Sequence, residues 1–266
     1  MNRVEKKFME LKAAKEKGFI VYITAGDPDI ETTVEIAREL VKSNVDLIEF
    51  GIPFSDPLAD GPTIQEASQR ALRRGITIKA ILKAIASLRS GTDVPFVFMT
   101  YYNPILKYGV KSFIKDAKES GVDGVIVPDL PIEESGELID IAEAEDFSLI
   151  LLAAPTSTDD RLKAIAKRSK GFIYYVSLTG VTGARKDMAA DLANNVKRIK
   201  RFTNKPVCVG FGVSTPDQAR EVAEVADGVI VGSAIIKVIE KNIGRDDLVK
   251  RVGNFTRTLV KGIKSK

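Results

Sequence analysis

The sequence contains no histidine, and this absence excludes more chemistry than any other feature of its composition. Without histidine, neither a Ser-His-Asp nor a Cys-His arrangement can form, and the commonest metal ligand is missing. The single cysteine, Cys208, rules out an internal disulfide and argues against a conventional zinc site. It lies in the apolar run "PVCVGFG", where we interpret it as a small buried side chain. Acid–base chemistry would therefore fall mainly to carboxylates, lysine or tyrosine.

Long hydrophobic runs and a strong charge of one sign are also lacking. No apolar run approaches the length of a membrane span. The N-terminal stretch "MNRVEKKFMELKAAKEKG" is charged, helical in pattern and without the apolar core of a signal peptide. The 40 basic and 36 acidic residues leave a net charge of only +4, dispersed along the chain. We therefore expect a cytoplasmic protein that binds neither nucleic acid nor membrane.

The sequence does contain eight short apolar runs separated by amphipathic segments. The runs are nearly continuous in apolar character, as strands buried on both faces are. They cover residues 19–26, 46–52, 95–102, 124–130, 148–155, 172–178, 206–212 and 228–234. Helical patterns cover residues 30–44, 77–91, 110–121, 132–146, 158–171, 188–203, 215–226 and 246–264. Several of them follow Asp, Ser or Thr and end at Gly or Asn, which are the usual cap and stop signals.

Eight alternations of strand and helix predict parallel strands joined by right-handed crossovers. In a chain of 266 residues, eight such units fit a (β/α)8 TIM barrel in the α/β class, with an extra N-terminal helix. An open doubly wound sheet is the alternative, but no Gly-rich dinucleotide turn is present. Without a linker or low-complexity segment, residues 1–266 are predicted to form a single domain. The active site of such a barrel lies at the C-terminal ends of the strands.

A carboxylate interrupts the second apolar run, in "VDLIEFGIPFSDPLADGPTIQ". Strand alternation puts Glu49 on the face opposite to Ile48 and Phe50, so it should point to the barrel axis. Poor solvation there would raise its pKa toward the range that proton transfer near neutral pH needs. Asp60 follows in a loop stiffened by prolines, where Asp before Gly is also ordinary turn chemistry. Together the two carboxylates suggest an acid–base pair.

Glycine-rich segments follow the last three runs: "SLTGVTGARK", "VGFGVSTPDQ" and "IVGSAIIKVIEK". Barrels of this type often bind phosphate with the loops after strands seven and eight and the start of a short helix. Gly212, Gly232 and Ser233 lie at those positions, and glycine lets backbone N–H groups approach an anion closely. We expect a small phosphorylated substrate, held here at one end and meeting Glu49 and Asp60 at the other.

The segments "LIEFGIPFSDPLADGPTIQ", "YITAGDPD", "VPDLPIEES", "SLTGVTGAR" and "VGFGVSTPDQ" together resemble the tryptophan synthase α subunit family over nearly the whole chain. "FSDPLADGP" is the most specific of these motifs, whereas other phosphate-binding barrels share the glycine loops. The resemblance implies a lyase that cleaves indole-3-glycerol phosphate to indole and glyceraldehyde 3-phosphate in tryptophan biosynthesis.

The resemblance also assigns roles to individual positions. Glu49 matches the general acid–base, and Asp60 matches the carboxylate that stabilises charge at the indole N–H. The matches in the indole pocket are Tyr22, Met99, Ile126, Tyr174 and Phe211. The matches at the phosphate are Gly183, Gly212, Gly232 and Ser233, and Thr182 matches a loop threonine that contacts the residue equivalent to Asp60.

A partner is implied as well. The family's β subunit carries pyridoxal phosphate, so no cofactor is expected in this chain, and two α and two β subunits form a heterotetramer. The proline-rich loop is expected to expose Pro53, Asp56 and Pro57 at the barrel mouth, where a partner could dock. Two other interpretations stay open from the residues alone: a sugar-phosphate isomerase or epimerase barrel, and a non-catalytic subunit that binds a phosphate ligand.

Overall fold

The computed structural model describes residues 1–176, 185–210 and 212–264, with the backbone alone for residues 185–189. Its strands are β1 (Gly18–Thr24), β2 (Leu47–Gly51), β3 (Phe96–Met99), β4 (Gly124–Ile126), β5 (Ser148–Ile150), β6 (Leu152–Ala153), β7 (Ile173–Val176), β8 (Val207–Gly210) and β9 (Gly228–Val231). All of them pair in parallel, as the buried apolar runs predict.

The sheet closes on itself through one segment of chain. Its order is β5-β4-β3-β2-β1-β9-β8-β7-β6, so β5 and β6 lie at its two ends. Yet only Leu151 separates β5 from β6, and its carbonyl accepts the Tyr174 N–H at 3.1 Å. The fifth predicted run therefore pairs with β4 through its first half and with β7 through its second half. This arrangement makes nine strand segments out of eight predicted strands and confirms the predicted barrel.

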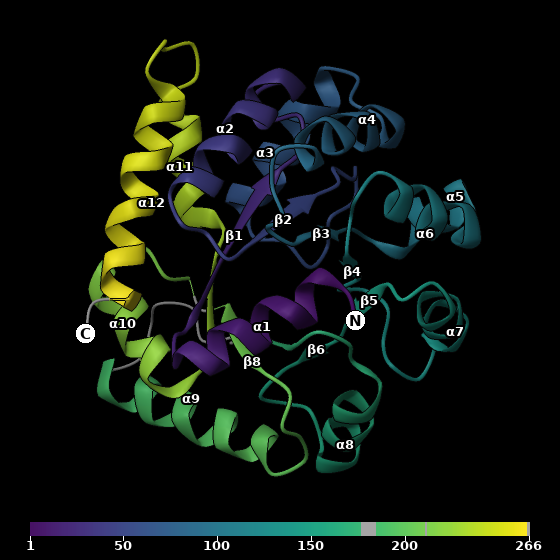
Figure 1. Ribbon diagram of the computed structural model, residues 1–266, viewed down its shortest axis with the longest axis vertical. Coiled ribbons are helices and arrows are strands. Elements are labelled where there is room, and N and C mark those ends of the chain that lie inside the picture. The colour runs from purple at the N-terminus through teal and green to yellow at the C-terminus, as the bar shows by residue number, and fades with distance from the viewer. Residues whose placement is uncertain (177–184, 211, 265–266) are drawn as a thin grey trace.

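Helices surround the strands (Figure 1). They are α1 (Arg3–Ala14), α2 (Ile30–Lys42), α3 (Pro62–Arg73), α4 (Ile78–Arg89), α5 (Tyr102–Tyr108), α6 (Val110–Glu119), α7 (Gly136–Ala144), α8 (Asp159–Arg168), α9 (Arg185–Lys200), α10 (Pro216–Val225), α11 (Ser233–Glu240) and α12 (Leu248–Lys264). The predicted helical segments match, but α3 and α5 are additional. The predicted third strand was too long, because β3 ends at Met99 and Tyr102 begins α5.

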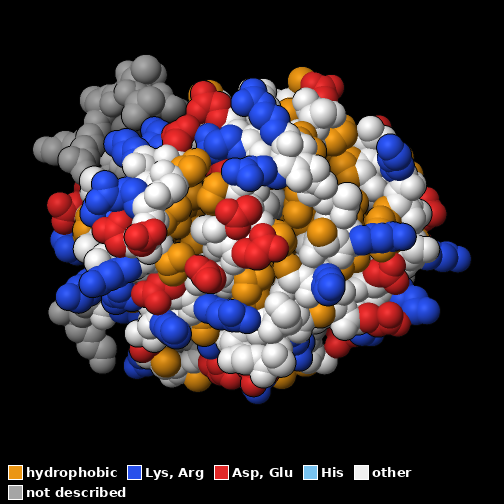
Figure 2. Space-filling view, turned by 90° about the horizontal axis from the view of Figure 1, so that it is seen from above, with side chains coloured by type: hydrophobic (Ala, Val, Ile, Leu, Met, Phe, Trp, Pro, Cys, Tyr) orange, Lys and Arg blue, Asp and Glu red, His pale blue; other side chains and the backbone are white. Residues whose placement is uncertain are grey.

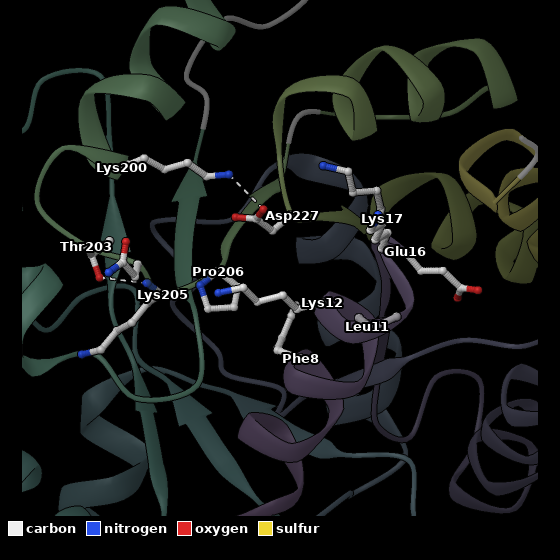
Figure 3. Close-up of a pocket in the computed structure, with 12 residues that line it drawn as sticks. Phe8, Leu11, Lys12, Glu16, Lys17, Lys200, Thr203, Lys205, Pro206 and Asp227 are labelled. Atoms are coloured by element: carbon white, nitrogen blue, oxygen red, sulfur yellow. Dashed lines mark hydrogen bonds and ion pairs between the residues drawn. The ribbon is translucent and has the colours of Figure 1, made fainter.

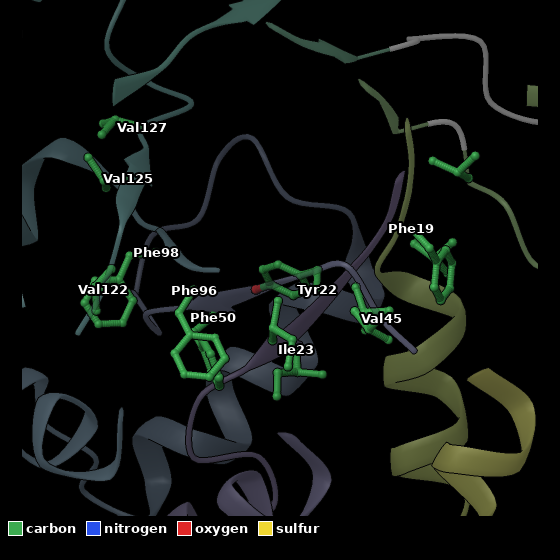
Figure 4. Packing of buried hydrophobic residues seen from close by; sticks show 14 of the residues in the cluster. Phe19, Tyr22, Ile23, Val45, Phe50, Phe96, Phe98, Val122, Val125 and Val127 are labelled. Carbon is green, nitrogen blue, oxygen red and sulfur yellow. The ribbon is translucent and has the colours of Figure 1, made fainter. Parts of the chain in front are cut away.

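The two faces of each strand build two separate clusters. In β2, Ile48 and Phe50 point outward into the large cluster between strands and helices, while Leu47 joins a smaller cluster inside the barrel. Phe50 meets Phe96 of β3 edge to face, with ring centroids 5.4 Å apart (Figure 4). The predicted alternation is therefore confirmed, and Glu49 shares the inward face with Leu47.

Helix α1 closes the N-terminal end of the barrel. Its buried residues Val4, Phe8 and Leu11 belong to the interior cluster, together with Ile20 of β1. A side chain at Gly18, where β1 begins, would press on Phe8 and Leu11. The interior is therefore filled from this end, which leaves the C-terminal end of the strands for a site.

Three aspartates at the N-terminal end accept hydrogen bonds from N–H groups at the starts of neighbouring strands. Asp46 accepts from Phe19 N, Asp123 from Phe96 N and Asp227 from Val207 N, each at 2.9 Å. Each aspartate lies just before a strand of its own. Because a buried N–H without a partner is costly, these carboxylates fix the strand starts in register.

Charges of both signs are interspersed on the face of the molecule that Figure 2 presents. This agrees with the small net charge of +4. In the described part of the chain, no helix combines the length and the apolar character needed to cross a membrane.

Candidate active site

Glu49 is the most unusual side chain of the barrel interior. It is completely buried, and neither carboxyl oxygen has a hydrogen-bond partner among the residues that the structure describes. Burial raises its pKa to about 8, because the charged form loses hydration that nothing replaces. At neutral pH this carboxyl group is mostly protonated. A structural ion pair with a basic neighbour, the alternative role for such a glutamate, is not formed by the described residues.

Asp60 lies on the loop that joins β2 to α3, and Tyr101 holds this loop in place. The Tyr101 hydroxyl accepts the Ala59 N–H at 2.9 Å, and its ring lies 5.3 Å from that of Phe54. Partial burial raises the pKa of Asp60 to about 6, and a hydrogen bond from Tyr101 opposes this shift. Gln65 of α3 donates to the Asp60 carbonyl at 2.7 Å. At neutral pH, Asp60 is mostly ionised while Glu49 is mostly protonated, so the two carboxyl groups are suited to different tasks.

Tyr22 lies close to Glu49 on one side and to Gly232 on the other. Its β1 position pairs in register with Glu49, and its pKa is raised by burial and further by the charges of Asp60 and Glu49. The ring lies over Gly51, where any side chain would overlap it. A Cβ at Gly232 would come within 3.3 Å of the Tyr22 Cβ. Tyr22 therefore lies close both to Glu49 and to Gly232, at one end of the barrel.

Three further predicted pocket residues lie on inward-facing positions. Tyr174 of β7 is buried, and the charges of Glu49 and Asp60 contribute to raising its pKa, after burial itself. Ile126 ends β4 and is fully buried, while Met99 ends β3 and is half-buried against the interior cluster. The predicted pocket residue Phe211 and the loop residues Thr182 and Gly183 lie outside the described residues.

The start of α11 provides N–H groups for an anion. Gly232 occupies its N-cap position without any side-chain cap, and Ser233 is its first residue. The first N–H groups of a helix have no partner within it and carry partial positive charge. Gly212, after β8, adopts a left-handed conformation with φ of 64° and has open space where a side chain would lie. These features suit a phosphate, but the sequence prediction of a phosphate site stays a prediction.

Sequence reasoning missed two contributors and misplaced one. Tyr101 lies two residues after the end of β3, where the rule of strand C-terminal ends could have found it. Gly51 was not assigned to the site, although its missing side chain makes room for Tyr22. Pro53 was expected to be exposed but is buried, two residues beyond the end of β2, whereas Asp56 is exposed and Pro57 is half-buried.

A separate pocket of about 450 Å³ lies at the opposite, N-terminal end of the barrel (Figure 3). Phe8 and Leu11 of α1 line it together with several lysines. Three of these lysines already bind protein groups: Lys200 pairs with Asp227, Lys17 donates to the Ala226 carbonyl, and Lys205 donates to carbonyls at the end of α8. Their ammonium groups support the fold, and we assign no chemistry to this pocket.

Within the described ranges, no group of three or more Cys, Asp or Glu side chains could hold a metal ion. The C-terminal end of the barrel instead offers a protonated acid, an ionised carboxylate and two buried tyrosines. Such a set can deliver a proton to a substrate and stabilise a positive charge beside it.

Comparison with known proteins gives one consistent result. The family model described as tryptophan synthase alpha chain matches residues 8–264. The tryptophan synthase alpha chain of Thermoanaerobacter sp. (strain X514) is 48% identical over 259 residues, covering 97% of this chain and 98% of its own length. That of Geotalea uraniireducens is 48% identical over 265 residues, covering 100% and 99%. The crystal structure of tryptophan synthase subunit alpha from Legionella pneumophila superposes with a TM-score of 0.93 at 38% identity, covering 100% of both chains.

Proposed function

Since this chain belongs to the tryptophan synthase alpha chain family, we propose that Glu49 and Asp60 perform the proton transfer and charge stabilisation of the family's reaction. That reaction is the lyase cleavage of indole-3-glycerol phosphate to indole and glyceraldehyde 3-phosphate, in tryptophan biosynthesis. The observation that carries the assignment is the buried, unpartnered carboxyl group of Glu49, whose pKa of about 8 keeps it protonated at neutral pH.

Indole can leave as a carbon group only after its ring carbon has been protonated. Glu49, as the acid, donates its proton to the ring carbon that carries the glycerol phosphate chain, and positive charge develops at the ring N–H. The Asp60 carboxylate stabilises that charge. The ionised Glu49 then takes the proton from the hydroxyl on the adjoining side-chain carbon. As that hydroxyl becomes the aldehyde, the carbon–carbon bond breaks and its electrons return to the ring, which leaves as neutral indole.

The binding residues follow the same division of the site. Tyr22, Met99, Ile126 and Tyr174 would enclose the indole, with Phe211 as a further member that the resemblance supplies. The phosphate would be held by Gly212, Gly232 and Ser233 at the start of α11. The resemblance adds Gly183 to the phosphate and Thr182 to the loop beside Asp60.

The family pairs with a β subunit that carries pyridoxal phosphate, and the α subunit itself binds no cofactor. We propose a heterotetramer of two α and two β subunits, with docking at the barrel mouth, where Asp56 and Leu58 are exposed. A function in amino-acid biosynthesis and the nearly balanced numbers of acidic and basic residues support a cytoplasmic location without nucleic-acid or membrane partners.

An indole-release assay on Glu49→Gln tests this function. Glutamine keeps the shape of the side chain but cannot shuttle a proton, so turnover should fall by about 10²–10⁴-fold. Binding of glycerol phosphate should stay unchanged, since the phosphate site lies on other loops. A variant that keeps more than about a tenth of normal turnover would contradict the role of Glu49. Failure of the wild-type chain to release any indole would favour the isomerase or epimerase alternative.

A further inference from the structure

Arg70 of α3 makes three ion-pair hydrogen bonds that join elements far apart in the sequence. Its Nε and Nη2 atoms each donate to one carboxylate oxygen of Asp27 at 2.8 Å. Its Nη1 atom donates to Glu240 at 2.9 Å. The Asp27 side chain has no exposed surface, whereas that of Glu240 is 39% exposed. Among the described residues, Arg70 is therefore the only side chain that bonds to the fully buried Asp27 carboxylate.

The three elements that meet at Arg70 carry the two ends of the proposed site. Asp27 follows β1, the strand of Tyr22. Helix α3 begins two residues after Asp60 and holds its carbonyl through Gln65. Glu240 is the last residue of α11, whose first residue is Ser233, and α11 packs directly against α3. Within the part of the chain that the structure describes, the side chains of Arg70, Asp27 and Glu240 bond to one another and not to Glu49.

We propose that Arg70 is a positioning residue, which sets the separation between Asp60 and the phosphate-binding start of α11. The proposal rests on the proposed function, because it concerns the two ends of the same substrate. A bidentate guanidinium fixes both distance and angle to a carboxylate, and the third bond then fixes α11 relative to that pair. A substrate held at both ends reacts well only if those ends are correctly spaced.

Stability alone gives a weaker explanation of this cluster. A buried ion pair commonly contributes little net stability, because desolvation of the two charges offsets their attraction. What a bidentate pair does supply is a defined geometry, and lysine, a single point charge, cannot reproduce it. The cluster joins the elements that carry the two ends of the proposed substrate site, and a defined geometry is useful there.

The test compares Arg70→Met with Arg89→Met in the full chain. Arg89 also pairs with a buried aspartate, Asp123, at 3.1 Å, but it lies at the N-terminal end of the barrel, away from the site. Both variants should lower the melting temperature. Only Arg70→Met should lower kcat and raise KM for indole-3-glycerol phosphate, reducing kcat/KM by about 10–100-fold, whereas Arg89→Met should stay within about twofold of wild type. Arg70→Met should also weaken binding of glycerol phosphate.

Two milder variants keep the proposal testable if Arg70→Met does not fold. Glu240→Ala leaves the buried Arg70–Asp27 pair intact and should raise KM more than it lowers kcat, since it frees only α11. Arg70→Lys should lose more activity than its drop in melting temperature would explain. Wild-type kinetic constants in Glu240→Ala and in a folded Arg70 variant would overturn the positioning role. The wild-type chain and Glu49→Gln, assayed in parallel, report separately on the proposed reaction.

Discussion

At the scale of single residues, Glu49 and Asp60 predict a bell-shaped dependence of kcat/KM on pH. Activity should fall below about pH 6, because protonated Asp60 no longer stabilises positive charge. It should also fall above about pH 8, because ionised Glu49 cannot deliver the first proton. Indole release measured from pH 5 to 9.5 tests both limbs. Asp60→Asn should lower activity and remove the acidic limb, and a limb that persists unchanged in this variant would have to come from another group.

The same glutamate has a predicted consequence for stability. Its pKa is about 8 in the folded chain against 4.5 for an unperturbed group, so the folded state binds this proton more tightly. The free energy of unfolding should therefore decrease as pH rises from about 4.5 to 8, by at most about 5 kcal/mol from this group. Glu49→Gln has no such proton. Its free energy of unfolding in urea should therefore increase relative to that of wild type when the pH is raised from 5 to 9. Parallel changes in the two proteins would mean that Glu49 is not desolvated.

At the scale of secondary-structure elements, the start of α11 predicts an effect of charge on phosphate binding. Ser233→Asp would place a negative charge among N–H groups that are proposed to hold the phosphate. We expect its affinity for glycerol phosphate to fall by at least about tenfold, as one unfavourable charge contact of roughly 1.4 kcal/mol would give. Titration of glycerol phosphate by calorimetry measures this directly.

The control for that titration is Asn204→Asp, which adds the same charge to an exposed loop at the opposite end of the barrel. Its affinity should match wild type. Equal affinities for all three proteins would place the phosphate elsewhere than at α11.

The elements also show what the sequence could and could not reveal. All eight strands were predictable, because strands buried on both faces consist of continuous apolar runs. Helix α3 was not, since its fully buried side chains, Ala67, Ser68 and Ala71, are small, and Ile64 is the one larger apolar side chain that it packs against the core. Helix α5 has seven residues, and its first, Tyr102, reads as a continuation of the strand before it. Small buried side chains and short helices give weak periodic signals.

The site was predictable to the extent that it depends on strand positions. Glu49 follows from strand alternation in β2, and Tyr174 of β7 follows from the resemblance. The bonds of Tyr101 to the Asp60 loop depend on how two loops meet, which no local pattern encodes. The same holds for Arg70, which contacts Asp27 and Glu240 across 43 and 170 residues of sequence.

At the scale of the whole molecule, the two ends of the barrel have different tasks. The N-terminal end contains α1 and the aspartates that accept strand N–H groups, so substitutions there should act mainly on stability. The C-terminal end contains the buried carboxyl group and the glycine loops. The prediction that residues 1–266 form a single domain stays a prediction, supported by one sheet that runs from Gly18 to Val231.

The exposed part of the Asp60 loop predicts that a partner changes the activity of the barrel. Leu58 is 85% exposed, an unusual state for a leucine two residues from a proposed catalytic carboxylate. A β subunit that covers this loop would bury Leu58 and restrict Asp60, and completing a site by ordering a loop raises turnover. We expect the rate of indole release at saturating substrate to increase when a tryptophan synthase β subunit is added. Spectrophotometric detection of indole measures this rate.

Complex formation must be established separately, by co-elution in gel filtration, so that a lack of activation can be interpreted. Glu49→Gln with the β subunit should stay inactive, because docking orders the loop but supplies no proton donor to the barrel interior. Leu58→Asp should weaken activation by exposing a charge to the apolar contact. If turnover is unchanged although the complex forms, the hydrogen bonds from Tyr101 and Gln65 already hold Asp60 in its working position, and the partner's role is confined to receiving the product.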